Sequence, residues 1–200
     1  MTITYPVHDG LYVNVTNRCP DHCTFCIRNE GDGAYGSGSL WLEREPSVEE
    51  IVDAIFANDL SKYKELVFCG YGEPLERLDA VKDVIRRAKE KAPGLPVRIN
   101  TNGLADLIHG RATAKELAGL ADAVSISLNA PDAATYQHYC RSDFGRAAYD
   151  AVLAYARDCM RYIPSVTMTV LDLLTPAQIE ESRAIAASIG AKFRVRAYEA

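Results

Sequence analysis

Short apolar runs alternate along the chain with longer segments of helical periodicity. The apolar runs predict six β-strands, near residues 11–15, 65–69, 96–100, 123–128, 165–170 and 192–196. Helical patterns fill the segments between them, at residues 47–58, 77–91, 113–120, 147–160 and 175–190. Because strands and helices alternate, the pattern predicts a single α/β domain with a parallel sheet and right-handed crossovers.

Two of the predicted helices carry clear end signals. Ser47 is a good N-cap residue, and Glu50 three positions later completes a capping box. The last helix begins with Thr175 as N-cap and Pro176 at its first position, and it ends at Gly190.

Alternate residues along a strand face opposite sides of the sheet, and their polarity indicates how the sheet is curved. In five of the strands one set of alternate residues (one parity) is apolar, with Val13, Val15, Val97, Ile99, Val124, Ile126, Leu128, Val166, Met168, Val170, Phe193 and Val195. The other parity is polar, with Asn14, Thr16, Arg98, Asn100, Ser125, Ser127, Thr167, Thr169, Arg194 and Arg196. A flat sheet with helices on both faces would be apolar at both parities.

The pattern therefore predicts a curved, barrel-like sheet with helices outside and a hydrated concave interior. Ligand would bind in that interior, near the C-terminal ends of the strands. The alternative is an α/β sheet whose polar face is left to another subunit.

Composition narrows the class of protein. The 200 residues suffice for one domain with a sizeable core, and 48% hydrophobic with 24% charged residues is typical of a soluble globular protein. The net charge of −5 disfavours nucleic acid and anionic membrane as partners. No apolar run approaches the ~20 residues of a membrane span, and the first residues do not resemble a signal peptide. We therefore expect a reducing, cytoplasmic location.

Three cysteines stand close together in the stretch RCPDHCTFCIRN, residues 18–29. Cys19, Cys23 and Cys26 have the spacing Cys-x3-Cys-x2-Cys. In a reducing compartment such a cluster indicates metal ligands or redox groups rather than disulfides. The other cysteines are scattered and are interpreted as small buried hydrophobic residues: Cys69, Cys140 and Cys159.

The cysteine set is one ligand short of a closed site. Structural zinc normally has four protein ligands, and the position of His22 gives no reason for it to point at the same metal. Three cysteines alone would leave one iron of a cubane cluster open to an external ligand. The loop follows the first predicted strand, at the rim where parallel α/β folds place their chemistry.

This spacing, with the aromatic Phe25 before the last cysteine, resembles the radical S-adenosylmethionine (SAM) superfamily. The resemblance implies a partial (β/α)6 barrel in which the three cysteines hold a [4Fe-4S] cluster. It implies that SAM chelates the fourth iron and is cleaved reductively to a 5′-deoxyadenosyl radical, which abstracts hydrogen from a substrate. It also implies an external electron donor similar to flavodoxin or ferredoxin.

Three further motifs carry the same resemblance: CGYGEP at 69–74, NTNG at 100–103 and SISLNAPD at 125–132. In the first, Tyr71 replaces a glycine of the family pattern, and in the last Asn129 replaces an acidic residue. The resemblance implies SAM contacts from Phe25, Gly72, Glu73, Asn102, Ser127, Asn129 and Arg141.

Over residues 11–198 the chain is similar in particular to the TatD-associated radical SAM family. That resemblance carries no substrate or reaction.

A second cysteine cluster is absent, and the chain ends just past the sixth predicted strand. We therefore expect a single-cluster core without an auxiliary cluster domain.

Arginines at the polar positions of the strands bear on the charge of the substrate. Arg98, Arg194 and Arg196 are predicted to point into the cavity, where burying cations without anions is costly. One interpretation is an internal salt-bridge network with Glu73, Asp172 or Glu199. The other leaves at least one arginine for an anionic substrate.

Two features of the sequence leave alternatives open. The glycine-rich segment 30–41 is either a mobile lid or a solvated loop. The function is either hydrogen abstraction from a small-molecule or peptide substrate, or that of a non-catalytic iron–sulfur or zinc scaffold. Glu73, Asn102 and Ser127 discriminate between enzyme and scaffold, because a structural metal site needs none of them.

Overall fold

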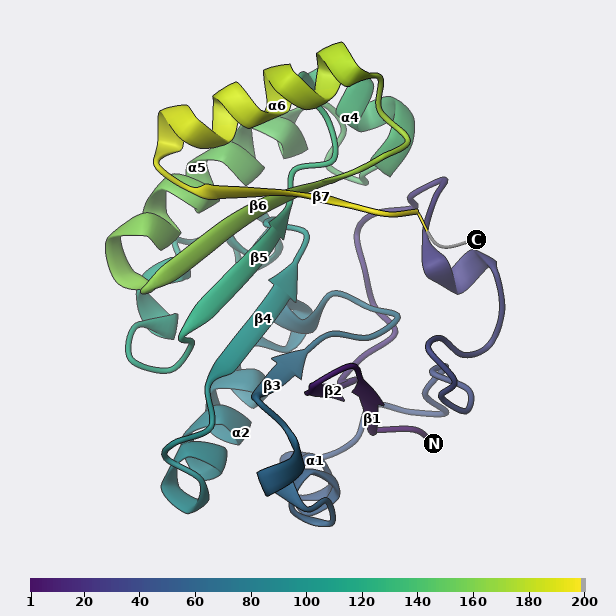
Figure 1. The fold of residues 1–200 in the computed structure, drawn as a ribbon, viewed down its shortest axis with the longest axis vertical. Helices are drawn as coiled ribbons and strands as arrows, with labels where there is room; N and C mark the ends of the chain where they lie inside the picture. Colours follow the sequence, from purple (N-terminus) through teal and green to yellow (C-terminus); the bar gives the residue numbers. More distant parts are fainter. Residues whose placement is uncertain (199–200) are drawn as a thin grey trace.

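A curved sheet of seven strands organises the computed structural model, which describes residues 1–198 (Figure 1). The strands follow one another in sequence order: β1 (Thr4–Val7), β2 (Gly10–Val13), β3 (Glu65–Phe68), β4 (Val97–Thr101), β5 (Ala123–Ser127), β6 (Ser165–Leu171) and β7 (Lys192–Arg196). The pair β1–β2 is antiparallel and every later pair is parallel. The predicted parallel sheet and its six strands are confirmed.

The first strand, β1, was not predicted. It contains Pro6, which lacks an N–H group and is tolerated only at the edge of a sheet. The turn from β1 to β2 places His8 at φ 49°, in the left-handed region. Because the segment lacks a β-strand signal and its turn is strained, the sequence pattern does not predict this hairpin.

Within residues 1–198, six α-helices connect or flank the strands: α1 (Val48–Phe56), α2 (Leu78–Lys91), α3 (Ala105–His109), α4 (Ala133–Cys140), α5 (Ala147–Tyr162) and α6 (Pro176–Ile189). The predicted capping box is present at α1. Thr175 is the N-cap of α6 as predicted, and it also forms a capping box with Gln178, which was not predicted. The helix predicted at 113–120 is instead a short 3-10 turn, Ala114–Leu117. The Thr113 hydroxyl donates to Asp106 Oδ1 at 2.7 Å and does not cap this segment.

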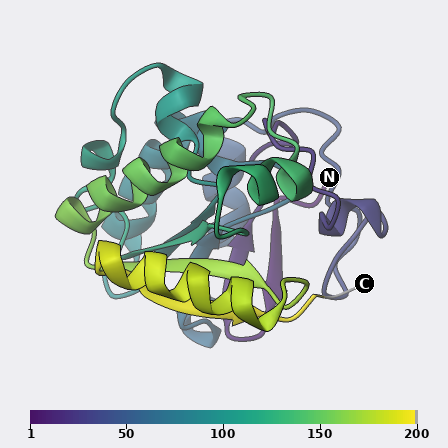
Figure 2. The ribbon, with the colours of Figure 1, turned by 90° about the horizontal axis from the view of Figure 1, so that it is seen from above.

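The helices cover the convex face of the sheet, and the segment after the cysteine loop lies on the opposite side (Figures 1 and 2). The predicted apolar parity packs into the main core beneath these helices. Val195 is the exception, because it lies on the edge strand β7 and is 36% exposed. The predicted polar parity faces the concave side, so the barrel-like curvature is confirmed.

A small apolar cluster covers one end of the concave face. Tyr5, Val7, Leu40 and Tyr71 form it, with Leu40 contributed by the glycine-rich segment 30–41. Tyr71 Oη donates to the Gly31 carbonyl oxygen at 2.7 Å. The segment therefore packs against the concave face.

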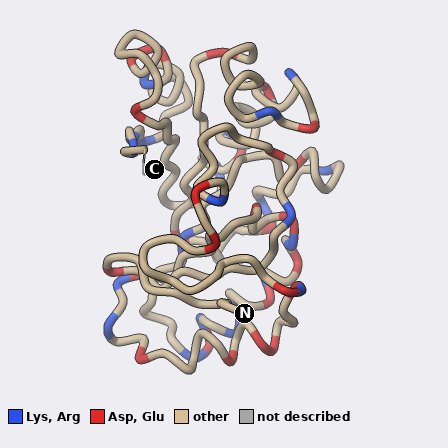
Figure 3. The backbone as a smooth tube through the Cα atoms, turned by 90° about the vertical axis from the view of Figure 1, so that its right-hand side faces the viewer, with Lys and Arg blue, Asp and Glu red and all other residues tan. Residues whose placement is uncertain are grey.

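Charge is spread over the molecule. Acidic and basic residues are interspersed along the helices and loops in Figure 3. Within residues 1–198, no helix is both long and apolar enough to cross a membrane.

A cysteine-lined cavity as the candidate cofactor site

A cavity of about 470 Å³ opens on the concave side of the sheet, at the C-terminal ends of the strands. Its wall brings together segments that are far apart in the sequence. The predicted site residues on this wall are Cys19, Cys23, Phe25, Cys26, Gly72, Glu73, Arg98, Asn102, Ser127, Asn129, Arg194 and Arg196. Arg141 is not among them: it is exposed and ends α4 in a left-handed conformation.

The cysteine loop follows β2 and is held against α4. His22 N donates to the Cys140 carbonyl oxygen at 2.9 Å, and Thr24 N donates to that of Tyr139 at 2.9 Å. Burial raises the pKa of the Cys19 thiol. A hydrogen bond with the Cys140 side chain, together with burial, raises the pKa of the Cys23 thiol. In this state both side chains favour the protonated thiol.

The donor set fits an iron–sulfur cluster in chemistry and location. Three soft sulfur ligands stand on one loop and face one cavity. Cationic iron stabilises thiolates that burial alone disfavours. Within residues 1–198, no three His, Cys, Asp or Glu side chains converge on a metal position.

Glu73 is the buried acid of the cavity. Its carboxylate accepts hydrogen bonds from Leu75 N at 3.0 Å, Thr101 Oγ1 at 2.8 Å and Asn102 N at 2.6 Å. Its own N–H donates to the carbonyl oxygen of Arg18, next to the first cysteine. Burial raises the pKa of this carboxyl to about 7 despite the three donors. Glu73 thus joins the ends of β3 and β4 to the cysteine loop.

We predict that Glu73 makes the stability of the cluster-free chain depend on pH. A raised pKa means that the folded state binds more protons than the unfolded state, so stability falls as pH rises from about 4.5 to about 7. The full loss is on the order of 3 kcal/mol. Urea unfolding at pH 5 and pH 7.5 measures it.

The matched variant is Glu73→Gln, which cannot ionise and should lose this slope. Asp21, whose pKa burial raises to about 6, contributes a smaller slope of the same sign to both proteins. Equal slopes for the wild type and Glu73→Gln would contradict the assignment.

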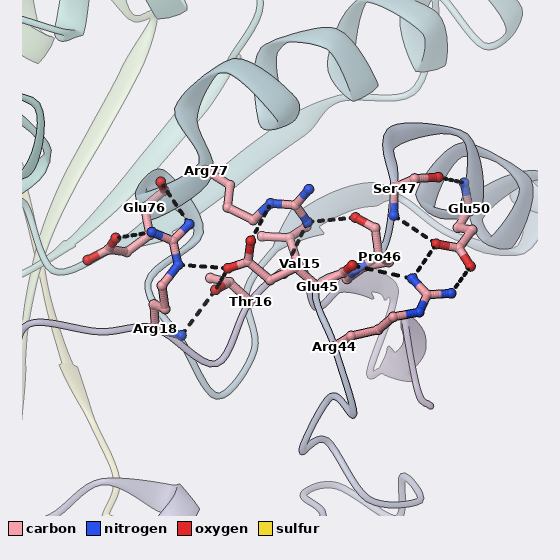
Figure 4. A network of polar contacts seen from close by, with 10 residues as sticks. All are labelled: Val15, Thr16, Arg18, Arg44, Glu45, Pro46, Ser47, Glu50, Glu76 and Arg77. Carbon is pink, nitrogen blue, oxygen red and sulfur yellow. Dashed lines mark hydrogen bonds and ion pairs between the residues drawn. The ribbon is translucent and has the colours of Figure 1, made fainter.

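The start of the cysteine loop is clamped by the ion-pair network of Figure 4. Glu45 lies at its centre and accepts from Thr16 Oγ1 and Arg18 Nε, each at 2.7 Å. Arg77 Nε lies 3.4 Å from the same carboxylate, and Arg77 also donates to the Val15 carbonyl oxygen at 2.8 Å. The residues just before Cys19 are therefore held from three directions.

We predict that Glu45→Gln weakens retention of the cluster. Arg18 and Glu45 are 56% and 39% exposed, so the network contributes only about 1 kcal/mol. Iron release to a chelator should therefore be roughly 5-fold faster. Glu50→Gln is the control, because Glu50 pairs with Arg44 in the same network and does not contact Thr16 or Arg18. Equal rates in the two variants would exclude a special role for Glu45.

The cavity arginines differ in how their charge is balanced. Arg98 donates to Glu65 through Nε at 2.9 Å and Nη2 at 2.6 Å, and its Nη1 donates to Asn100 Oδ1 at 2.6 Å. The partner of Arg98 is thus Glu65 and none of the predicted acids. The Asp172 carboxylate instead accepts from Tyr198 N at 2.8 Å. Arg194 and Arg196 have no carboxylate partner among residues 1–198, and Glu199 lies outside the described residues.

Asn129 occupies a special backbone position in the cavity wall. Its φ of 58° lies in the left-handed region, which asparagine tolerates better than most residues. Its Nδ2 donates to Cys140 Sγ at 3.5 Å, and its buried Oδ1 has no hydrogen-bond partner within residues 1–198. Ser127, at the end of β5, is only partly buried. The Asn129 Oδ1 is therefore free to accept a hydrogen bond from a bound ligand.

One scattered cysteine was misinterpreted. Cys140 and Cys159 are buried as predicted, but Cys69 is partly exposed and lines the cavity beside Asn100. Tyr12, which bonds Arg98, was also missed. The position of Cys69 at the end of a predicted strand was the signal that could have placed it at the rim.

A partial barrel with a three-cysteine loop after its first parallel strand defines a cofactor-binding α/β protein. The sequence profile of the radical SAM superfamily matches residues 13–185. The chain therefore belongs to the radical SAM superfamily, whose members use a [4Fe-4S] cluster and SAM.

Similar proteins have diverse activities. A GTP 3′,8-cyclase of Rhodococcus opacus is 31% identical over 147 residues, which cover 74% of this chain and 39% of the cyclase. A probable dual-specificity RNA methyltransferase RlmN of Rhodococcus erythropolis is 35% identical over 153 residues, covering 64% of this chain and 40% of the methyltransferase. The chain thus spans about two fifths of the length of these relatives.

A solved structure shows the same fold. SuiB of Streptococcus suis, bound to the precursor peptide SuiA, has a TM-score of 0.71 at 15% identity. The match covers 96% of this chain and 39% of SuiB.

Proposed function

We propose that this chain is the core of a radical SAM enzyme. The observation that carries the proposal is the meeting of the three-cysteine loop, Glu73 and Asn102 in one cavity at the C-terminal strand ends. When bound, a [4Fe-4S] cluster would supply the electron for reductive cleavage of SAM, and this chemistry would lead to hydrogen abstraction from the substrate. Cys19, Cys23 and Cys26 would hold three of the irons.

Glu73 would bind the amino group of SAM. Three donors occupy its carboxylate, which has about four acceptor positions, so one remains for an ammonium group. Asn102 lies beside it, with Nδ2 3.9 Å from Cys19 Sγ, and would contact the methionyl part.

The far end of SAM would lie along β5. The orphan Oδ1 of Asn129 can accept a ribose hydroxyl, a role for which an acidic side chain is not needed. Ser127 would contact the carboxylate or ribose. Phe25 and Gly72 would shape the wall near the cluster. Arg141 stays a prediction for the SAM carboxylate, and binding through it would require movement at the end of α4.

The reaction partner and setting are proposed more broadly. The relatives are named for GTP and for RNA, and for this chain we propose an anionic or peptide substrate. We propose an external flavodoxin- or ferredoxin-like electron donor, a cytoplasmic location suited to six free cysteines, and kinship with the TatD-associated radical SAM family.

Cofactor loading tests this proposal. The protein is reconstituted anaerobically with iron and sulfide, and iron, sulfide and SAM binding are measured. Cys26→Ala should lose the cluster and SAM binding. Cys159→Ala, which removes a buried thiol on α5, should retain both. A closed zinc site in place of a cluster, or a full cluster that binds no SAM, would favour the scaffold instead.

A further inference from the structure

The edge strand β7 presents two cations to the cavity. Arg194 and Arg196 are two positions apart, so their side chains leave the same face of the strand. Both line the cavity wall. In the register of the sheet Arg194 lies opposite Thr169, and Arg196 lies opposite Leu171.

The positive charge of this pair is not balanced by residues 1–198. Arg196 is partly buried, and its Nε–H is inaccessible to solvent and has no hydrogen-bond acceptor among residues 1–198. Burial lowers the pKa of its guanidinium, and the neighbouring Arg194 lowers it further. A buried donor without a partner is costly to the folded protein. A bound anion would remove this cost.

The charge of Arg98, in the same cavity, is balanced by a carboxylate. Its guanidinium forms a bidentate pair with Glu65 and bonds to Asn100, which leaves little for a ligand. Among residues 1–198, the arginines of the cavity wall that lack a carboxylate partner therefore lie on β7.

The arginine pair comes from a different strand than the residues proposed to hold the cofactors, and all of them line the same cavity. The cysteine loop follows β2, Glu73 follows β3, Asn102 follows β4, and Asn129 follows β5. Strand β7 forms the other edge of the sheet (Figure 1). A group bound there would lie in the same cavity as the proposed SAM site.

We propose that Arg194 and Arg196 form a subsite for an anionic oxygen group of the substrate, either a phosphate or a carboxylate. Arginine presents a planar fork of donors that matches both groups. This inference rests on the proposed function, since it places the substrate beside the SAM site. It removes Arg98 from the predicted substrate contacts and assigns that residue to the framework.

The test is calorimetric titration of the cluster-loaded chain with phenyl phosphate and with benzoate, at fixed ionic strength, with and without SAM. The two probes distinguish a phosphate from a carboxylate. Arg196→Gln and Arg194→Gln should each weaken binding of the preferred anion at least about 10-fold. Lys192→Gln is the control, because Lys192 lies on the same strand and face, is exposed, and does not line the cavity. It should stay within about 2-fold of the wild type.

The outcomes separate this inference from the proposed function. If neither probe binds the wild type, or if Lys192→Gln loses as much affinity as Arg196→Gln, the subsite does not exist. If SAM competes with the probe and Arg196→Gln weakens SAM equally, the arginines belong to the SAM site and the inference is overturned. If SAM fails to bind but the anion titration without SAM shows the predicted arginine dependence, the subsite stands and the proposed function falls.

Discussion

Gly72→Ala should break the contact between the cysteine loop and the turn after β3. We expect it to lower the free energy of unfolding by on the order of 3 kcal/mol. A Cβ at this position would lie 2.4 Å from the Thr16 carbonyl oxygen and 2.6 Å from that of Arg18. Both atoms belong to the backbone, so no side-chain rotation relieves the clash. Because Arg18 precedes Cys19, cluster loading should fall with stability. Urea unfolding and iron content measure the two effects.

Gly94→Ala is the matched control. A Cβ there meets nothing within 4 Å, so stability should change by less than about 0.5 kcal/mol. A Gly72→Ala protein as stable and as fully loaded as Gly94→Ala would show that the turn after β3 is not packed on the loop as described.

Arg98→Met should destabilise the protein by about 2 kcal/mol. The change removes the pair with Glu65 and leaves that carboxylate and Asn100 Oδ1 without their donor. Breaking a fully buried pair costs more, but the Glu65 side chain is 33% exposed and recovers part of its hydration. Chemical denaturation measures the loss.

A double-mutant cycle with Glu65→Gln isolates the pair. The Arg98→Met and Glu65→Gln losses should combine to less than their sum, with a coupling of about 1 kcal/mol or more. Simple additivity would indicate that Arg98 contributes through Tyr12 and Asn100 alone.

Much of the fold follows from local patterns in the sequence. In β4, residues alternate between core and cavity, because helices cover one face and water or ligand meets the other. Ser47 and Thr175 cap their helices as predicted because a side-chain oxygen satisfies a free N–H within the same segment.

The parts that were not predicted depend on distant contacts or weak local signals. Strand β1 forms because it pairs with β2, although Pro6 argues against a strand. Arg98 finds Glu65 because Arg98 lies beside Val67 in the register of two strands, which no sequence spacing reveals. The eight-residue helix α4 has little amphipathic pattern and was overlooked.

The part of the candidate site that is formed by sequence motifs was predictable. The cysteine loop and Glu73 meet because both follow parallel strands whose carboxyl ends share one rim. The uncompensated charge of Arg196 could not be read from the sequence, since it depends on which acids lie within reach.

Reductive cleavage of SAM is the most direct assay of the proposed radical SAM activity. The anaerobically reconstituted protein is reduced with dithionite, given SAM, and assayed for 5′-deoxyadenosine by chromatography beside Cys26→Ala. The wild type should produce deoxyadenosine, and the variant should produce only background. A fully loaded, reduced wild type that makes no deoxyadenosine, or a Cys26→Ala protein that makes as much, would contradict it.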